Sequence, residues 1–300
     1  MLLSQILDYI KQKGIPYSVE RFTDTDITGI SVPAESTPTS LLFFIRGIPN
    51  DFNFSYGACL IKKSAISDKA SLTNVIQVED PRLVTILVAN LFKPYFSQKK
   101  ALISARAVIH PEAKIGKNVI VMDNAVLGKC TVGDYTVIHP NVVVYDGVEI
   151  GALCEIDANT TLGAEGMGQN RYDDGRILKF PHFSRLIIKD NVLIGPNVTI
   201  SKGILTPTII ESGCMINALV HIAHNVHIGG RTALSMGAIV GGSAKIGKGC
   251  WLAPNSTVRN QVTIADNITV GMGAVVTKSF HQHGMTLVGI PARILENEEA

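Results

Sequence analysis

Three histidines stand three residues apart in the segment HIAHNVH, at His221, His224 and His227. A histidine side chain can act as a general base near neutral pH, and several converging histidines can bind a metal ion such as zinc. The backbone that carries the segment decides between these kinds of chemistry, because it determines whether the three imidazoles converge or point apart.

A six-residue repeat predicts that backbone. Every sixth residue from position 210 to position 276 is Ile, Leu or Val, and the residue four positions later is nearly always small. An α-helix repeats every 3.6 residues and a half-buried strand every two, whereas a parallel β-helix with three six-residue faces repeats every six. The sequence therefore predicts a mainly β fold, a triangular β-helix with about 18 residues per coil. Earlier blocks keep the same step at 109–127, 132–162 and 188–200.

This coil separates the three histidines. His221 and His227 take equivalent positions on adjacent faces, about 120° apart, so one metal ion cannot bind all three rings and we expect no metal site. Exposed, inert positions are the simplest interpretation of these two residues, and a metal shared between subunits is the alternative. His224 lies 18 residues before Gly242, which places the pair in adjacent coils.

The pairing of His224 with Gly242 suggests acyl transfer. Glycine has no side chain to cover its peptide N–H, so the pair could supply a general base and an oxyanion donor about one strand spacing apart. A turn requirement is the alternative reason for the glycines at 241 and 242.

The chain divides into three predicted regions. Residues 1–103 indicate a small α/β domain, with helical spacing over 3–10, a helix start at Asp80-Pro81 and short apolar runs typical of strands. Residues 104–280 form the β-helix, interrupted by a polar, glycine-rich insertion at 163–184 and a shorter one at 201–207. Such an insertion can close over a ligand or brace a neighbouring subunit. Residues 281–300 form a C-terminal extension.

Composition excludes several classes of function. The formal charge is +2 and the charged residues are interspersed, which argues against a nucleic-acid or anionic-membrane partner. No apolar run reaches the roughly 20 residues that span a bilayer. The five cysteines are widely spaced without a CxxC pair, which indicates buried thiols in a reducing compartment and a cytoplasmic location.

The repeats, the GAEGMG loop, the run IAHNVHIG and the closing VGIPAR together resemble the left-handed β-helix acyltransferases. The similarity is greatest to the UDP-3-O-(3-hydroxyacyl)glucosamine N-acyltransferases of lipid A synthesis. The resemblance implies a left-handed coil, although parallel crossovers are generally right-handed. It also implies His224 as the general base, the Gly242 N–H as the oxyanion donor, and a homotrimer with active sites between adjacent prisms. No metal or redox cofactor is implied, since acyl carrier protein or coenzyme A brings the acyl group as a co-substrate.

The resemblance also implies a set of binding residues. Those for the nucleotide-linked amino sugar are Phe43, Arg46, Gly163, Glu165, Met167, Asn217, His221 and Gln261, and those for the acyl donor are Gly241 and Arg293. Phe43 would stack on the nucleobase, within a nucleotide-binding N-terminal domain.

Several positions depart from the family pattern. Asn217 replaces an acidic residue seven before the base, Gln261 replaces a second histidine, and Pro49 replaces one of two nucleobase-stacking aromatics. Arg46 stands where the family has an amide. The ending VGIPARILENEEA is similar to that of acetyl-CoA-dependent sugar acetyltransferases, where Pro291 and Arg293 would lie near the pantetheine arm or the phosphates. The alternatives are therefore an acetyl-CoA-dependent sugar N- or O-acetyltransferase, another UDP- or dTDP-linked amino sugar, or a non-catalytic or metal-binding β-helix.

Overall fold

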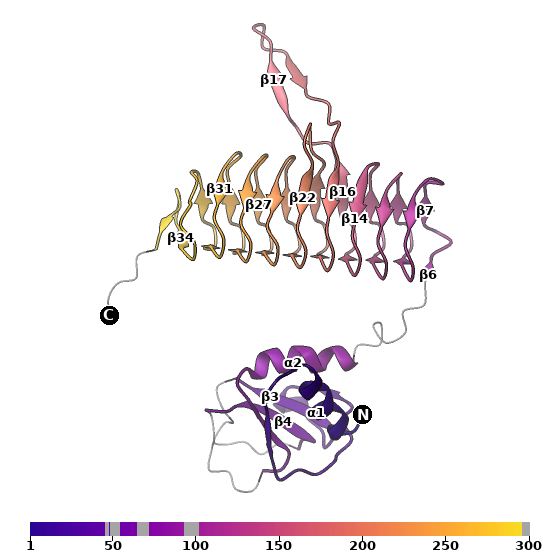
Figure 1. Cartoon of the computed structure of the whole chain (residues 1–300), viewed down its shortest axis with the longest axis vertical. Helices are drawn as coiled ribbons and strands as arrows, with labels where there is room; N and C mark the ends of the chain where they lie inside the picture. The colour runs from indigo at the N-terminus through magenta and orange to yellow at the C-terminus, as the bar shows by residue number, and fades with distance from the viewer. Residues whose placement is uncertain (46–47, 49–54, 65–71, 93–101, 296–300) are drawn as a thin grey trace. The chain divides into compact units, whose positions relative to one another are not determined.

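Two compact units make up the chain in the computed structural model, which describes residues 1–45, 48, 55–64, 72–92 and 102–295. The first unit spans Met1–Gln98 and the second spans Lys99–Ala300. Figure 1 shows an α/β fold in the first and a long coil of short strands in the second.

The first unit is a five-stranded sheet in the order β1-β5-β4-β3-β2, in which only the pair β1 and β5 is antiparallel. Helix α1 (Leu3–Gln12) buries the face that its 3.6-residue spacing predicts. Helix α2 (Pro81–Ala89) begins after Asp80, whose carboxylate accepts the Leu83 N–H at 3.0 Å, as the Asp-Pro signal predicts. The remaining elements are β1 (Ser18–Glu20), β2 (Gly29–Ile30), η1 (Pro33–Glu35), β3 (Ser40–Phe44), β4 (Ala58–Lys62), β5 (Val75–Val78) and η2 (Asn90–Phe92).

The second unit is a parallel β-helix with three faces, each a sheet of short strands, as the six-residue period predicts. The β24 face comprises β7 (Val108–Ile109), β10 (Val126–Leu127), β13 (Val143–Val144), β16 (Thr161–Ala164), β21 (Thr199–Ser201), β24 (His221–Ile222), β27 (Ile239–Val240), β30 (Thr257–Val258) and β33 (Val275–Val276). The β25 face comprises β8 (Lys114–Ile115), β11 (Thr131–Val132), β14 (Val148–Ile150), β19 (Leu186–Ile188), β22 (Thr208–Ile210), β25 (His227–Ile228), β28 (Lys245–Ile246) and β31 (Thr263–Ile264). The β23 face comprises β6 (Leu102–Ile103), β9 (Ile120–Val121), β12 (Val137–Ile138), β15 (Glu155–Ile156), β20 (Leu193–Ile194), β23 (Met215–Ile216), β26 (Ala233–Leu234), β29 (Trp251–Leu252), β32 (Thr269–Val270), β34 (Thr286–Val288) and β35 (Arg293–Ile294).

Aliphatic side chains fill the interior of the coil. The Ile, Leu and Val residues spaced by six between positions 210 and 276 are all at most 2% exposed. Strand pairing usually advances by 18 residues, as in Ile222 with Val240. Exceptions occur at the slip in the repeat, where Ile115 pairs with Val132, and at the two insertions, where Ile150 pairs with Ile188 and Ile188 with Ile210. Burying each such side chain contributes about 1.5–3 kcal/mol, so the repeat itself is the main source of the coil's stability.

Two predicted segments take a form that the repeat does not specify. The insertion at 163–184 contains an antiparallel hairpin, β17 (Gln169–Arg171) with β18 (Ile177–Lys179), which projects from the β-helix in Figure 1. The start of the predicted extension at 281–300 instead continues the β23 face, because β34 pairs with β32 and β35 folds back on β34. Residues 296–300 lie outside the described residues.

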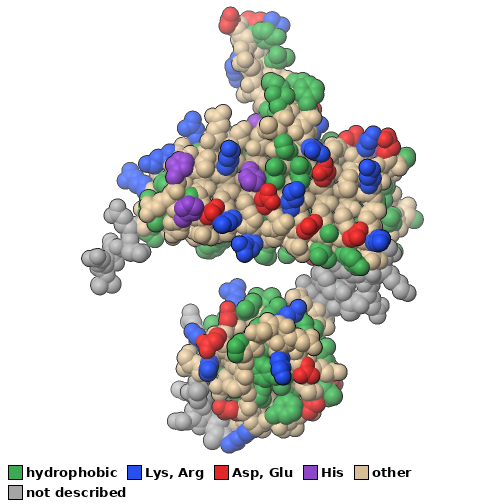
Figure 2. All heavy atoms as spheres, viewed as in Figure 1, with side chains coloured by type: hydrophobic (Ala, Val, Ile, Leu, Met, Phe, Trp, Pro, Cys, Tyr) green, Lys and Arg blue, Asp and Glu red, His purple; other side chains and the backbone are tan. Residues whose placement is uncertain are grey.

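The surface charges are interspersed and the cysteines are buried, as the composition and the cysteine spacing predict. In Figure 2, Lys and Arg side chains mix with Asp and Glu on the face in view. All five cysteines are buried and unpaired, and burial raises the pKa of the Cys59 thiol to about 12, which makes it a poor nucleophile. Among the described helices, none combines the length and the apolar character that crossing a bilayer requires.

Corners of the coil use asparagine in the left-handed conformation. Nine asparagines of the β-helix have φ between 53° and 61°, a region that asparagine tolerates better than most residues. They are Asn118, Asn124, Asn141, Asn159, Asn191, Asn197, Asn225, Asn255 and Asn267.

One buried hydroxyl in the corners lacks a partner. Within the described residues, Ser256 Oγ makes no hydrogen bond, whereas Thr232 Oγ1 donates to the Gly247 carbonyl at 2.8 Å and accepts the Cys250 N–H at 3.1 Å. We expect Ser256→Ala to raise the free energy of unfolding by about 1 kcal/mol, since it removes an unpaired buried polar group. Thr232→Val should lower it by about the same amount, and urea titration of the two variants measures both changes. A loss of stability in Ser256→Ala would mean that the hydroxyl has a partner in solution.

Candidate active site

His224 lies at the corner between the β24 face and the β25 face. The residue follows β24 and precedes β25, in a turn rather than in a strand, and its side chain is half-buried. His221 and His227 lie in those two strands, on adjacent faces as the period predicts. His224 itself lies in the corner between the faces, although its position two residues after Ile222 predicts a place midway along a face. The described residues contain no group of three His, Cys, Asp or Glu side chains that could hold a metal ion.

Gly242 passes against the imidazole of His224 one coil later. A Cβ at Gly242 would lie 2.8 Å from Cε1 and 2.9 Å from Nε2 of His224, so any larger residue would displace the ring. The flanking residues hold this turn in register, because Ser243 N–H donates to the His224 carbonyl at 2.9 Å and Gln261 N–H donates to the Gly242 carbonyl at 2.9 Å. Among the described residues, no hydrogen bond uses the N–H of Gly242.

Asn225 fixes the orientation and the tautomer of His224. The amide nitrogen of Asn225 donates to the Thr206 carbonyl at 2.6 Å and contacts Thr206 Oγ1 at 2.8 Å, which leaves its Oδ1 as an acceptor. His224 Nδ1 lies 2.9 Å from that Oδ1 and must carry the proton. Nε2 therefore keeps its lone pair, as a general base requires.

The long insertion returns to the same corner. Gly166 is so close that a Cβ on it would lie 3.1 Å from His224 Cδ2 and 3.2 Å from His182 Nε2. The rings of His182 and His224 meet edge to face with centroids 5.5 Å apart. The insertion thus forms one wall of the site. Figure 2 shows apolar side chains where the insertion joins the β-helix.

The predicted residues of the insertion have distinct roles. Gly163 has φ of 84°, and a Cβ there would lie 2.3 Å from Val148 Cγ2, so the chain leaves the coil at a position that needs glycine. Glu165 forms an ion pair with Lys179 at 2.7 Å, and this contact lowers the pKa of its carboxyl group. Met167 follows Gly166 in the chain and is 76% exposed.

Asn217 lies at a different corner from His224. It lines a groove of the β23 face together with Glu155 and Asp157, and its Oδ1 accepts the Ala218 N–H at 2.7 Å. Within one chain, Asn217 therefore does not orient His224, and Asn225 does so instead. His221 is also outside the corner, with Nδ1 2.7 Å from Thr199 Oγ1 on the outer surface of the β24 face.

The remaining predicted residues are spread over the molecule. Gln261 is exposed one coil beyond Gly242, and Gly241 packs closely, since its Cβ would lie 2.5 Å from the Asn260 nitrogen. Arg293 is exposed on β35 of the β23 face, so it cannot reach His224 of the same chain around the corner. Phe43 belongs to β3 of the first unit, where it is half-buried against the apolar core. Arg46 and Pro49 lie outside the described residues.

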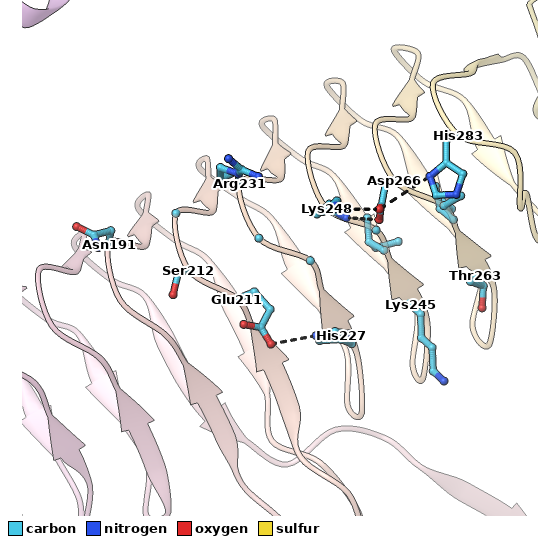
Figure 3. A pocket seen from close by; sticks show the side chains of 17 residues that line it. Asn191, Glu211, Ser212, His227, Arg231, Lys245, Lys248, Thr263, Asp266 and His283 are labelled. Carbon is cyan, nitrogen blue, oxygen red and sulfur yellow. Dashed lines mark hydrogen bonds and ion pairs between the residues drawn. The ribbon is translucent and has the colours of Figure 1, made fainter. Parts of the chain in front are cut away.

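An open groove on the β25 face holds the third histidine of the segment. Figure 3 shows His227 directed at Glu211, with Nε2 3.3 Å from Oε1, and Asp266 between Lys248 and His283. His224 does not line this groove.

The sequence pattern does not point to Asn225, Thr206 or His182. Asn225 has the same sequence context as the other corner asparagines, and Thr206 and His182 lie in insertions outside the repeat.

The coil and this corner define a class of protein. A parallel β-helix built from hexapeptides, with a histidine beneath an unpaired peptide N–H, is the framework of a hexapeptide acyltransferase. The description "Bacterial transferase hexapeptide (six repeats)" fits residues 129–164 and 243–278 of this chain.

More specifically, the chain belongs to the UDP-3-O-acylglucosamine N-acyltransferase family, and it is an acyltransferase. It is 31% identical over 231 residues to the family member from Coxiella burnetii, covering 71% of this chain and 67% of that protein. It is 34% identical over 228 residues to the member from Methylobacillus flagellatus, covering 70% and 65%.

Solved structures support the left-handed β-helix fold. The UDP-N-acetylglucosamine O-acyltransferase of Moraxella catarrhalis matches with a TM-score of 0.60 at 23% identity, over 65% of this chain and 75% of that one. The UDP-N-acetylglucosamine acyltransferase of Bacteroides fragilis matches with a TM-score of 0.59 at 24% identity, over 65% and 74%.

Proposed function

We propose that the protein transfers an acyl group from a thioester, on acyl carrier protein or coenzyme A, to the amine of UDP-3-O-acylglucosamine in lipid A synthesis. The observation that supports this most directly is the contact between the His224 imidazole and Gly242, because it combines a base with an unpaired N–H donor. The relatives named UDP-3-O-acylglucosamine N-acyltransferase support UDP-3-O-acylglucosamine as the acceptor substrate.

The proposed reaction needs only these groups and the two substrates. His224 Nε2 removes a proton from the acceptor amine as its nitrogen attacks the thioester carbonyl carbon. The Gly242 N–H donates to the oxyanion that forms. When the C–S bond breaks, the imidazolium returns the proton to the thiolate, so that an amide and a free thiol are the products. No step in this scheme calls for a metal or redox cofactor.

A homotrimer in the cytoplasm, where thioester donors are made, completes the proposal. Arg293 and Asn217 lie on the β23 face, away from the His224 corner of their own chain. In a trimer, the β23 face of one prism would lie beside the His224 corner of the next. Arg293 would then bind the acyl donor. The acceptor would be bound by Asn217, His221 and Gln261. The insertion would form part of the acceptor site, and a nucleobase-binding role for Phe43 and Arg46 stays a separate part of the proposal. Light scattering should give about three times the 32.2 kDa chain mass.

Product analysis tests the reaction. Purified protein is incubated with UDP-3-O-acylglucosamine and acyl carrier protein or coenzyme A thioesters of several chain lengths, and products are identified by mass spectrometry. We expect an alkali-stable amide with stoichiometric thiol release, and no product with UDP-glucose, which lacks the amine. Acetylation from acetyl-CoA alone would instead support a sugar acetyltransferase, and an alkali-labile ester would contradict N-acylation.

Asn225 provides a second test. Asn225→Ala removes the acceptor that holds His224 Nδ1, so the imidazole loses both its orientation and its fixed tautomer. We expect kcat to fall about 10- to 100-fold, the equivalent of one hydrogen bond in the transition state. Asn255→Ala is the matched control, because Asn255 is a corner asparagine with φ of 57° on another part of the coil. Equal kcat values for the two variants would exclude a role for Asn225 beyond the corner.

A further inference from the structure

His182 is a buried histidine that the proposed reaction does not use. It lies in the insertion, is 4% exposed and occupies the side of the His224 ring away from Asn225. Its two nitrogens contact the two legs of the insertion. Gly166 N–H donates to Nε2 at 3.1 Å, and Nδ1 lies 2.9 Å from the Phe180 carbonyl oxygen.

These contacts define a single protonation state. Nε2 must hold a lone pair to accept from Gly166, so Nδ1 carries the proton and donates to Phe180. Burial lowers the pKa of His182 below its ordinary value, and the nearby His224 acts in the same direction. With both nitrogens engaged, a neutral His182 has no free site for proton transfer.

The surrounding charges tie the same two legs together. Glu165 Oε1 lies 3.4 Å from the His182 backbone nitrogen, and the carboxylate pairs with Lys179 at 2.7 Å and with Lys202 at 4.0 Å. Gly166 packs tightly against both rings, because a Cβ on it would lie 3.1 Å from His224 Cδ2 and 3.2 Å from His182 Nε2. The His224 ring is thus confined by Asn225 at Nδ1, by Gly242 across Cε1 and Nε2, and by Gly166 and His182 at Cδ2.

We propose that His182 is a positioning residue, which locks the insertion against the general base and so holds the His224 imidazole in its reactive orientation. This rests on the proposed role of His224 as the base. His182 acts through Gly166 and the packing of the two rings.

Three variants separate positioning from simple support. His182→Phe keeps an aromatic ring but loses both hydrogen bonds, His182→Gln keeps one acceptor and one donor, and His227→Gln is the control on the β25 face. We expect His182→Phe to lower kcat about 10- to 100-fold with acceptor KM changed less than about 3-fold, because misplacement of a catalytic group by about 1 Å costs that much. His182→Gln should recover kcat to within about 5-fold of the unchanged protein, and His227→Gln should match it.

Imidazole NMR gives a readout that needs no substrate. Long-range proton–nitrogen spectra should show His182 protonated at Nδ1, and His182→Phe should shift both the Gly166 amide and the His224 ring signals. An unchanged kcat in His182→Phe, or a higher KM at constant kcat, would overturn the positioning role. If His182→Phe does not fold, the spectra of the unchanged protein still test the proposal, because His182 protonated at Nε2 would also overturn the positioning role. Activity that survives His224→Ala would instead remove the base from the proposed function, while the spectra would still test whether His182 holds the ring.

Discussion

His224→Ala is expected to lower kcat for acyl transfer about 1,000-fold, with little change in the thermal midpoint. A positioned general base contributes about 100- to 10,000-fold, and the described corner offers no second imidazole with an available lone pair, since both nitrogens of His182 are engaged. The half-buried ring makes no contribution to the apolar interior, which consists of the residues spaced by six. The measurement is the steady-state rate of amide formation with saturating donor and acceptor.

A paired variant makes the result specific to the corner. His227→Ala removes a histidine three residues away in sequence, whose ring contacts Glu211 on the neighbouring face. It should leave kcat within about 2-fold, because surface substitutions away from a site have small effects. If both His224→Ala and His227→Ala show the same rate as the unchanged protein, then His224 is not the general base. Another residue, for example one on a neighbouring subunit, would have to take that role.

The coil could be predicted from the sequence because its physical cause is local and repeated. Each face buries one aliphatic side chain per six residues, so the period shows in the sequence and fixes which residues stack. The period alone therefore predicts that His224 and Gly242 lie in adjacent coils. It also predicts that His221 and His227 lie on adjacent faces.

The insertion and its contacts could not be predicted in this way. No period relates His182 to His224, which are 42 positions apart, and their meeting depends on how a hairpin leaves the coil at Gly163 and returns. The role of Asn225 could not be predicted for another reason. Its φ of 60° satisfies the corner requirement shared by eight other asparagines, and only its bonds to Thr206 and His224 distinguish it. Asn217 stands seven residues before His224, where the family has an acidic residue, and the coil places it at another corner.

Gly242→Ala is expected to lower kcat/KM about 100-fold while the coil remains folded. The backbone at Gly242 does not have positive φ, so alanine meets no conformational strain there. Its methyl group would lie 2.8–2.9 Å from Cε1 and Nε2 of His224, closer than two such atoms can pack. The ring cannot retreat freely, because Gly166 and Asn225 confine its other edges. It must rotate out of line with the substrate amine, and a displacement of about 1 Å can account for the predicted loss.

The neighbouring glycine shows how the effect can be assigned to the ring. In Gly241→Ala the methyl group would lie 2.5 Å from the Asn260 nitrogen, which is backbone of the next coil and cannot rotate aside. That variant should lose about 1–3 kcal/mol of stability through overpacking, seen as a lower thermal midpoint. Gly242→Ala should keep the thermal midpoint and lose activity, since the group it meets is a side chain. The pair of measurements therefore separates a glycine needed for coil packing from one needed for the base, and a Gly242→Ala variant with full kcat/KM would show that the imidazole does not lie against residue 242 during turnover.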